Sequence, residues 1–408
     1  MDDTTTAAPV FNPLSPEFIR DPYPYYRRLR DHDPLWPSPF GYRLASRHAD
    51  IASILRDRRF GKSYAERMAK RYGEHAMEEE PAFRTMRVWM LNLDPPDHTR
   101  LRGLVVKAFT ARRVEEMRPR IEAIVDETID RIEARGTMDV ISDFALRLPV
   151  TVICDMLGIP DEDRERFFDR SRDVDGGRLL DPVPMTRAEL DAANERSEAS
   201  MDYFRHLFAL RRAEPGDDLT TQLVYAEEQG QKLSEEELVA NINLLFGAGH
   251  ETTVNLIGNG LLALHRNPDQ LRLLRERPEL GPNAVEELLR YDSSVQLTGR
   301  TAQQDVVVSG VEIKAGDGVL CLIGAGNRDP AVYDQPERLD ITRTRIEPLS
   351  FGGGIHYCLG AQLARIEGEI AIATLLRRLP RLTLDNIEEP EWRPTFVLRG
   401  LKQLVAHW

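Results

Sequence analysis

The sequence predicts a mainly α-helical chain with small β-sheets, a fold of the α+β class. Between residues 114 and 212, apolar residues recur at helical spacing with only short interruptions. A second and more apolar helical run extends from Ser234 to Arg266. Strand-like segments are short and few, and the clearest lie within residues 306–322. Helices are therefore expected to supply most of the core.

Composition indicates a globular enzyme with a large core. The 408 residues are 41% hydrophobic and 30% charged, and this length permits one large domain or two to three ordinary ones. A formal net charge of -13 argues against nucleic acid or an anionic membrane as the main partner. The sequence has no apolar run of membrane-spanning length and begins without the basic and apolar regions of a secretion signal. We therefore expect no membrane anchor and a cytoplasmic location.

The N-terminal part combines short helices and strands in its pattern. Helical spacing predicts helices over 16–29 and 49–55, and the proline and glycine breaks within 35–44 predict short strands or a hairpin. From 60 to 93 the pattern loses regularity. Such a stretch is a functional lid or a solvated loop, and the sequence does not choose between them.

A histidine and an arginine begin the next predicted helix. Asp94, the two prolines after it and Asp97 are helix-start signals. His98 and Arg102 are four residues apart, so they share one face of that helix. Two cationic donors on one face can hold a carboxylate, although an ordinary solvated face has the same pattern.

Polar and small residues interrupt the long apolar helix, which opens at a capping box, Ser234-Glu235-Glu236-Glu237. Glycines at Gly247 and Gly249 let a helix widen locally and free a carbonyl, and Thr252 can hydrogen-bond into such a gap. Glu251 beside Thr252 then forms a proton relay. The alternative is a helix kink that has no chemical role.

The C-terminal part alternates helices with short strands. A helix over 284–290 places Glu287 and Arg290 on one face. Apolar segments bounded by turn residues predict strands at 306–308, 311–313, 319–322, 382–384 and 401–405. The first three are expected to form a small antiparallel sheet, and the last two to close the chain.

Only one of the three cysteines has a setting suited to a metal. Cys154 and Cys321 lie in apolar runs and are expected to be inert buried thiols. Cys358 follows a glycine-rich loop and precedes a helical pattern, and a helix N-terminus favours the thiolate, the form that binds metals. Two other interpretations are a small packing residue and a phosphate-binding loop, although no Gly-Lys-Ser/Thr follows the glycines.

One loop and one helix segment resemble motifs of the cytochrome P-450 family. Residues 351–360 have the spacing Phe-Gly-x-Gly-x-His-x-Cys-x-Gly of its haem-ligand loop, and residues 248–252 match its oxygen-activation motif Ala-Gly-x-Glu-Thr. The resemblance implies that Cys358 is the axial thiolate ligand of haem iron. It also implies that Glu251 and Thr252 deliver protons during oxygen activation.

Further segments resemble the same family. Glu287 and Arg290 match its Glu-x-x-Arg pair, a buried ion pair that Arg338 is implied to complete, although Leu339 replaces the commoner Phe. The residues implied to bind the haem propionates are His98, Arg102, Arg300 and His356. Further haem contacts are implied at Ala248, Gly249, Phe351 and Gly360, and the substrate pocket at Val88, Leu91, Leu245, Val295, Leu297 and Phe396.

The resemblance implies a haem-thiolate monooxygenase of one catalytic domain, residues 1–408, with the cytochrome P-450 fold and haem b (iron protoporphyrin IX) between the long helix and the cysteine loop. It would insert one oxygen atom of O2 into a lipophilic small molecule by hydroxylation or epoxidation. With no fused reductase domain, electrons are expected from a ferredoxin or flavodoxin and its NAD(P)H reductase. Alternatives are a peroxide-driven peroxygenase and a haem sensor or carrier, which the pair Glu251-Thr252 disfavours.

Overall fold

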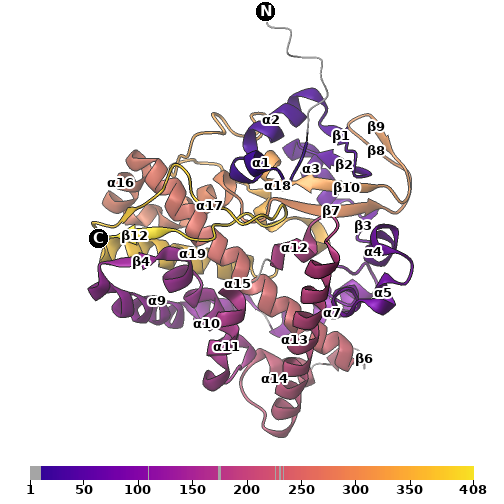
Figure 1. Ribbon diagram of the computed structural model, residues 1–408, viewed down its shortest axis with the longest axis horizontal. Helices are drawn as coiled ribbons and strands as arrows, with labels where there is room; N and C mark the ends of the chain where they lie inside the picture. The colour runs from indigo at the N-terminus through magenta and orange to yellow at the C-terminus, as the bar shows by residue number, and fades with distance from the viewer. Residues whose placement is uncertain (1–10, 109, 173–175, 226, 229–230, 233) are drawn as a thin grey trace, which may run out of the picture.

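The computed structural model describes residues 11–108, 110–172, 176–225, 227–228, 231–232 and 234–408. Helices form most of this part of the chain, and a mixed sheet lies to one side together with the first helices (Figure 1). The long helix α15 (Glu235–Arg266) crosses the middle of the molecule (Figure 1). No helix among the described residues is both long and apolar enough to span a membrane.

The first predicted helix is in fact two helices. Asp21 has extended backbone because the residue before a proline avoids helical angles, so the helical pattern is divided at Pro22. The predicted hairpin and the helix after it are confirmed. The elements are α1 (Pro16–Arg20), α2 (Tyr23–His32), β1 (Leu35–Pro37), β2 (Tyr42–Ala45) and α3 (His48–Arg56).

The irregular stretch predicted over 60–93 is wrong, because most of it is helical. Its helices are too short to show a clear period, and they are separated at Gly73, which has a φ of 105°, and at Pro81. Their apolar residues still share one buried cluster, which includes Met68 and Phe83. The elements are β3 (Phe60–Gly61), α4 (Tyr64–Tyr72), α5 (Ala76–Glu79) and α6 (Pro81–Arg87).

The helical pattern over 114–212 is confirmed, with breaks at Gly136 and Gly158, both in left-handed backbone. The break predicted from 175 to 184 contains a short helix, while residue 175 itself lies outside the described residues. The elements are α7 (Asp97–Ala108), α8 (Ala111–Glu116), α9 (Arg118–Ile132), η1 (Glu133–Arg135), β4 (Thr137–Asp139), the π-helix η2 (Val140–Ala145), α10 (Arg147–Leu157), α11 (Asp161–Arg172), α12 (Gly176–Leu180), α13 (Arg187–Ala213), α14 (Leu219–Tyr225), β5 (Glu227–Glu228) and β6 (Gln231–Lys232).

The capping box of α15 is confirmed by reciprocal bonds between Ser234 and Glu237. The local widening expected at Gly247 and Gly249 is wrong, because the helix is α-helical from end to end. The Thr252 hydroxyl donates to the Ala248 carbonyl, one turn back, at 3.1 Å. This bond needs no gap in the helix, since a threonine can add it to a carbonyl that already accepts a backbone bond.

The strands form several small sheets. The largest has the order β1-β2-β10-β7-β3, in which β10 runs parallel to β2 and antiparallel to β7. The single antiparallel sheet predicted from 306–322 is wrong, because β8 and β9 pair only with each other. All residues of β10 are buried, which suits a central strand. These strands are β7 (Leu297–Ala302), β8 (Val306–Val308), β9 (Val311–Ile313) and β10 (Gly318–Leu322).

The C-terminal strands β11 and β12 form a three-stranded sheet with β4, in the order β11-β12-β4. The strand predicted at 382–384 is confirmed as β11, which pairs antiparallel with β12, and β12 also pairs with β4. The strand predicted at 401–405 is wrong except at Val405, where β12 begins, because Leu401 makes only an isolated bridge to Trp392. The remaining elements are α16 (Pro268–Glu276), η3 (Pro278–Leu280), α17 (Gly281–Tyr291), α18 (Ile323–Gly326), η4 (Leu349–Phe351), η5 (Gly354–His356), α19 (Ala361–Arg378), β11 (Thr383–Leu384) and β12 (Val405–His407).

Candidate active site

The glycine-rich loop before Cys358 packs tightly against the end of α3. Gly352 and Gly354 have φ values of 70° and 65°, which other residues rarely adopt. A Cβ on Gly354 would lie 2.3 Å from the carbonyl oxygen of Leu55, so only glycine fits there. The Cys358 amide then donates to the Phe351 carbonyl at 2.9 Å. The loop is thus held at both of its ends.

Cys358 is the exposed cysteine, and its exposure is to an internal cavity. Burial raises the pKa of the Cys154 thiol to about 12 and that of Cys321 to about 11, so both are inert as predicted. Desolvation also raises the pKa of Cys358, and the Gly360 amide and nearby arginines oppose this only in part. The thiolate expected from the helix N-terminus is therefore not favoured by the protein alone. A coordinated metal cation deprotonates such a thiol.

A cavity of about 740 Å³ lies between α15 and the Cys358 loop. It brings together most residues predicted for the site, although His98 lies behind its wall. Those that line it are Leu91, Arg102, Leu245, Ala248, Gly249, Glu251, Thr252, Val295, Leu297, Arg300, Phe351, His356, Cys358 and Gly360. The lining as a whole is mostly apolar, which suits a lipophilic molecule.

Two residues predicted for the pocket are not among the described residues that line the cavity. Phe396 is 2% exposed and packs edge-on against Phe11 and Phe18, in a buried cluster with aromatic residues of the N-terminal segment. Val397 and Leu398 line the cavity instead. Val88 was also misplaced; its neighbours Trp89 and Met90 line the cavity, while the Val88 carbonyl accepts a bond from Asn241 of α15.

Basic side chains surround one edge of the cavity. His98 is 2% exposed, and neither of its ring nitrogens has a hydrogen-bond partner among the described residues. Burial, followed by repulsion from Arg102, lowers the pKa of His98 to about 4. Burial, followed by repulsion from Lys62 and Arg300, lowers the pKa of His356 as well. Buried donors that repel one another and lack acceptors fit the carboxylates of a bound dianion.

Lys62 also belongs to this basic edge, and the sequence analysis did not predict it as a site residue. It is 4% exposed, and its Nζ lies 3.5 Å from the Gly299 carbonyl. Burial and the neighbouring Arg300 and Arg67 lower its pKa. No motif or periodicity marks Lys62, because only the pairing of β3 with β7 brings it beside Arg300.

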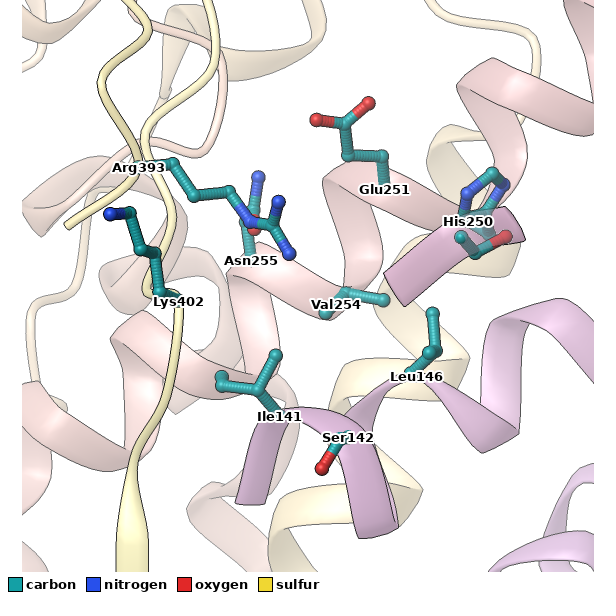
Figure 2. Close-up of a pocket in the computed structure, with 10 residues that line it drawn as sticks. Ile141, Ser142, Leu146, His250, Glu251, Val254, Asn255, Arg393 and Lys402 are labelled. Atoms are coloured by element: carbon teal, nitrogen blue, oxygen red, sulfur yellow. The ribbon is translucent and has the colours of Figure 1, made fainter. Parts of the chain in front are cut away.

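Glu251 lies between the cavity and a second, smaller pocket. The smaller pocket, of about 200 Å³, is lined by Glu251 and Asn255 of α15 and by Ser142 of η2. Figure 2 shows Arg393 and Lys402 of the C-terminal segment across from these side chains. Glu251 lines both spaces and Thr252 only the larger one. A carboxylate in this position can exchange protons with either side.

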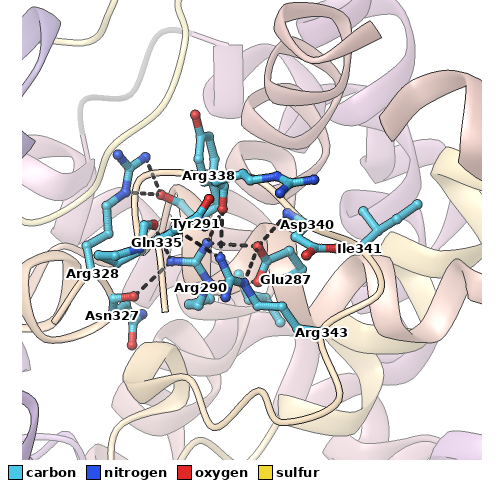
Figure 3. Close-up of polar contacts among 12 residues, drawn as sticks. Glu287, Arg290, Tyr291, Asn327, Arg328, Gln335, Arg338, Asp340, Ile341 and Arg343 are labelled. Atoms are coloured by element: carbon cyan, nitrogen blue, oxygen red, sulfur yellow. Dashed lines mark hydrogen bonds and ion pairs between the residues drawn. The ribbon is translucent and has the colours of Figure 1, made fainter. Parts of the chain in front are cut away.

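Glu287 and Arg290 form a fully buried pair on α17 (Figure 3). Arg290 Nε lies 2.7 Å from Glu287 Oε2, and its Nη1 donates to the Asn327 carbonyl at 3.1 Å. The Asn327 side chain in turn accepts from the Leu349 amide at 2.7 Å, at the start of the loop. The ion pair is therefore connected to the segment that carries Cys358.

The third arginine of this network is Arg343, not Arg338 as predicted. Arg343 Nε lies 3.1 Å from Glu287 Oε1 (Figure 3). Arg338 is exposed and contributes only its backbone carbonyl, which accepts from both Arg290 and Arg343. Arg343 also donates to the Gln335 and Arg338 carbonyls, at 3.0 Å each, so the turn that contains both residues lies against its guanidinium.

Comparison with known proteins identifies the family. The family model for cytochrome P450 matches residues 60–279 and 276–399.

The chain belongs to the cytochrome P450 family.

Cytochrome P450 107B1 of Saccharopolyspora erythraea is 42% identical over 411 residues, which cover 98% of each chain. Vitamin D(3) 25-hydroxylase of Pseudonocardia autotrophica is 41% identical over 407 residues, covering 98% of this chain and 97% of that protein. The crystal structure of P450BioI in complex with hexadec-9Z-enoic acid ligated acyl carrier protein has a TM-score of 0.89 and 38% identity, covering 97% of this chain and 100% of that one.

This P450 is therefore a monooxygenase with a haem cofactor and the P450 fold, as predicted. The residues present fit that group. The unpartnered buried nitrogens of His98 and His356 match its two carboxylates, and the thiol of Cys358 opens into the same cavity. Gly247 and Gly360, which line the cavity, have no atom within 4 Å of an added Cβ and leave room for a flat ring system.

Glu367 of α19 is a further residue that the sequence did not reveal. It lines the cavity next to α15, is 1% exposed, and neither carboxylate oxygen makes a hydrogen bond of normal geometry within the described chain. Burial raises its pKa to about 8, against an opposing effect of the Thr253 hydroxyl. A glutamate in an amphipathic helix normally faces solvent, so its burial was not predictable from the pattern.

Proposed function

We propose that this P450 inserts one oxygen atom of O2 into a lipophilic small molecule, by hydroxylation or epoxidation. The observation that carries the proposal is the position of Thr252 and Glu251 on α15, lining the cavity into which the thiol of Cys358 opens. An oxygenase needs a proton source on the side of the cavity where oxygen binds, and a haem sensor or carrier does not.

The proposed cofactor is haem b. Cys358 would hold its iron, and bound haem supplies a redox centre at which O2 is reduced. The propionates would lie against the basic edge described above, where His98, Arg102, Arg300 and His356 donate charge-assisted hydrogen bonds. Lys62 adds a further cation to this edge. Phe351, Gly360, Ala248 and Gly249 line the cavity and would contact the ring faces.

Glu251 and Thr252 would divide the handling of protons. Glu251 takes up a proton from the smaller pocket and releases it on the cavity side, since its side chain lines both spaces. The Thr252 hydroxyl is oriented by its bond to the Ala248 carbonyl and lines the cavity directly. The hydroxyl oxygen of Thr252 can then accept a hydrogen bond from a proton donor in the cavity and so hold that donor opposite the Cys358 loop.

The substrate wall is proposed at Leu91, Leu245, Val295 and Leu297, joined by Val397 and Leu398. This apolar wall supports a lipophilic substrate. One similar protein is named a vitamin D(3) 25-hydroxylase. Another, P450BioI, forms a complex with an acyl carrier protein that carries hexadec-9Z-enoic acid.

We also propose that residues 1–408 form one catalytic domain. The family model matches residues 60–279 and 276–399, which supports one domain over that stretch. The proposed electron donors are a ferredoxin or flavodoxin and its NAD(P)H reductase. The predicted cytoplasmic location is consistent with such carriers.

The experiment that tests the proposal uses the haem-loaded protein and its Cys358→Ala variant. With reductase and ferredoxin, the wild type should consume O2 in the presence of a substrate that shifts the iron spin state, and give an oxygenated product. Its reduced CO complex should show the red-shifted band of a thiolate ligand, and Cys358→Ala should lose that band. Efficient turnover with hydrogen peroxide alone would favour the peroxygenase alternative, and no O2 consumption with any spin-shifting ligand would favour a sensor.

A further inference from the structure

Arg67 of α4 lines the cavity without a polar partner. Its Nε is buried and makes no hydrogen bond within the described chain, and none of its other nitrogens is bonded to a described residue. The guanidinium carbon lies 5.9 Å from the centre of the Tyr64 ring. Nη1 lies so close to Gly299 of β7 that an added Cβ there would be 2.8 Å away. The side chain is therefore held by packing, and its donors remain available.

Two other arginines of the same cavity wall have their donors occupied. Arg178 bonds to Asp181 at 3.3 Å and to Glu189 at 3.0 Å. Arg71 donates to the Asp181 carbonyl at 2.9 Å and to the Tyr42 hydroxyl at 2.7 Å. Arg67 thus differs from its neighbours in having no acceptor, which is costly for a largely enclosed cation.

Basic side chains gather near Gly299. Lys62, Arg67, Arg102 and Arg300 all line this end of the cavity, and burial, followed by repulsion from Arg300 and Arg67, lowers the pKa of Lys62. The acid among them is Asp94, whose carboxylate accepts from the amides of Lys62 at 2.9 Å and Ser63 at 3.2 Å. Neither of these bonds involves Arg67, so Arg67 has no bonded carboxylate within the described chain. Its charge is therefore open to another anion.

Arg67 is the cation placed for that role. The charges that act on His356 are those of Lys62, Arg300, His98 and Arg102, which together surround the propionate edge. Arg67 is not among them, but it acts on Lys62 and Arg300, and its other ionisable neighbours are Tyr42, Arg71, Tyr64 and Asp94. It therefore adjoins the propionate edge at Lys62 and Arg300, on the part of the wall formed by α4 and β7.

We propose that Arg67 binds the carboxylate of the substrate, which is then a monocarboxylic acid with a long apolar body. The apolar wall around Leu91, Leu245 and Leu297 receives the body, and the guanidinium holds the acid end away from the Cys358 loop. This inference rests on the proposed monooxygenase function and specifies its substrate class. An ester or a carrier-bound thioester of the same chain lacks the anion and gains nothing from Arg67.

The test measures binding of dodecanoic acid and of its methyl ester to the haem-loaded protein, through the spin-state change of the iron. Arg67→Met keeps much of the side-chain length and removes the charge, and Arg67→Lys restores a charge. Lys70→Met is the matched control, because Lys70 lies on the same helix and is exposed. Haem content is measured for every variant.

The wild type should bind the acid at least tenfold more tightly than the ester. Arg67→Met should weaken binding of the acid about tenfold and leave the ester unchanged, Arg67→Lys should recover part of the loss, and Lys70→Met should match the wild type. Equal affinity for acid and ester in the wild type would overturn the proposal. Loss of haem from Arg67→Met would also overturn it, because Arg67 would then serve a propionate.

A separate measurement distinguishes failure of the proposed oxygenase function from failure of the proposed role of Arg67. Displacement of a fluorescent fatty acid from the haem-loaded protein reports occupancy of the cavity whether or not O2 is consumed. An enzyme that turned over only neutral substrates and did not bind the fluorescent acid would keep its proposed function and contradict the role of Arg67.

Discussion

The imidazole rings of His98 and His356 lie 4.2 Å apart, centre to centre, although one comes from α7 and the other from the loop before Cys358. Both ring nitrogens of His98, and Nε2 of His356, have no hydrogen-bond partner within the described chain. Two basic rings in contact, with Lys62 and Arg300 beside them, form a site whose stability depends on an anion.

His98 is therefore expected to contribute to haem retention. His98→Phe keeps a ring and removes both nitrogens, and it should speed haem loss about tenfold, or about 1.4 kcal/mol. Lys62→Met should act in the same direction. The rate is measured by transfer of haem to an excess of apomyoglobin. His206→Phe, at an exposed position on α13, is the control and should leave the rate unchanged.

Arg343 and Arg338 provide a matched pair for the buried network. Arg343→Met should destabilise the protein by about 1–3 kcal/mol, because it removes a charged partner from the buried Glu287. Arg338→Met should change stability by less than about 0.5 kcal/mol, since its side chain is exposed. Thermal unfolding followed by circular dichroism checks both. Equal effects would contradict the assignment of Arg343 to the network.

Thr252 is expected to control how electron uptake couples to product. Thr252→Ala removes the hydroxyl that lines the cavity, so NAD(P)H consumption should continue while product yield falls several-fold and peroxide accumulates. Thr252→Ser should restore most of the coupling. Product and peroxide are measured per NAD(P)H consumed, and unchanged coupling in Thr252→Ala would count against the relay.

Glu367 should make stability fall as the pH rises. Its pKa is raised from 4.5 to about 8 by burial, so the folded protein holds this proton more tightly than the unfolded chain does. The stabilisation is complete below the unfolded pKa and is lost as the pH approaches and passes the folded one. Glu367→Gln should remove up to about 4 kcal/mol of this dependence between pH 5 and pH 8. Melting temperatures of both proteins across this range test it; parallel curves would mean that Glu367 does not titrate.

Long periodic segments and fixed motifs were predictable from the sequence. The helix α15 and its capping box, the helical stretch over 114–212 and the loop around Cys358 all carry strong local signals. These signals are local because caps, glycine conformations and apolar spacing act over a few residues. The family resemblance then implied that Thr252, Arg300 and Cys358 share a site, and these three residues line one cavity.

Features that depend on contacts between distant segments were not predictable. Among the short helices over 60–93, α6 packs against α13 and α15, while α4 and α5 pack against each other and against α6, so their stability comes from tertiary contacts and their own pattern is weak. Lys62 reaches the cavity through the β3–β7 pairing, and Arg343 reaches the buried Glu287 across 56 residues of sequence. The alternation of apolar residues along a strand does not identify the strand with which it pairs. Outside the strands, no local pattern shows which of two adjacent residues, such as Phe396 and Val397, faces the cavity.

The strand order β1-β2-β10-β7-β3 also has a consequence for biosynthesis. The strands β1 and β2 are made early, yet β2 is completed only by β10, whose last residue is Leu322. During translation, the edge of β2 that pairs with β10 stays without its hydrogen-bonding partner until most of the chain has left the ribosome. The cysteine loop emerges later still and then docks on α3. Haem can therefore be captured only at the end of synthesis, and the supply of cofactor at that moment, more than the speed of early folding, should set the yield of active enzyme.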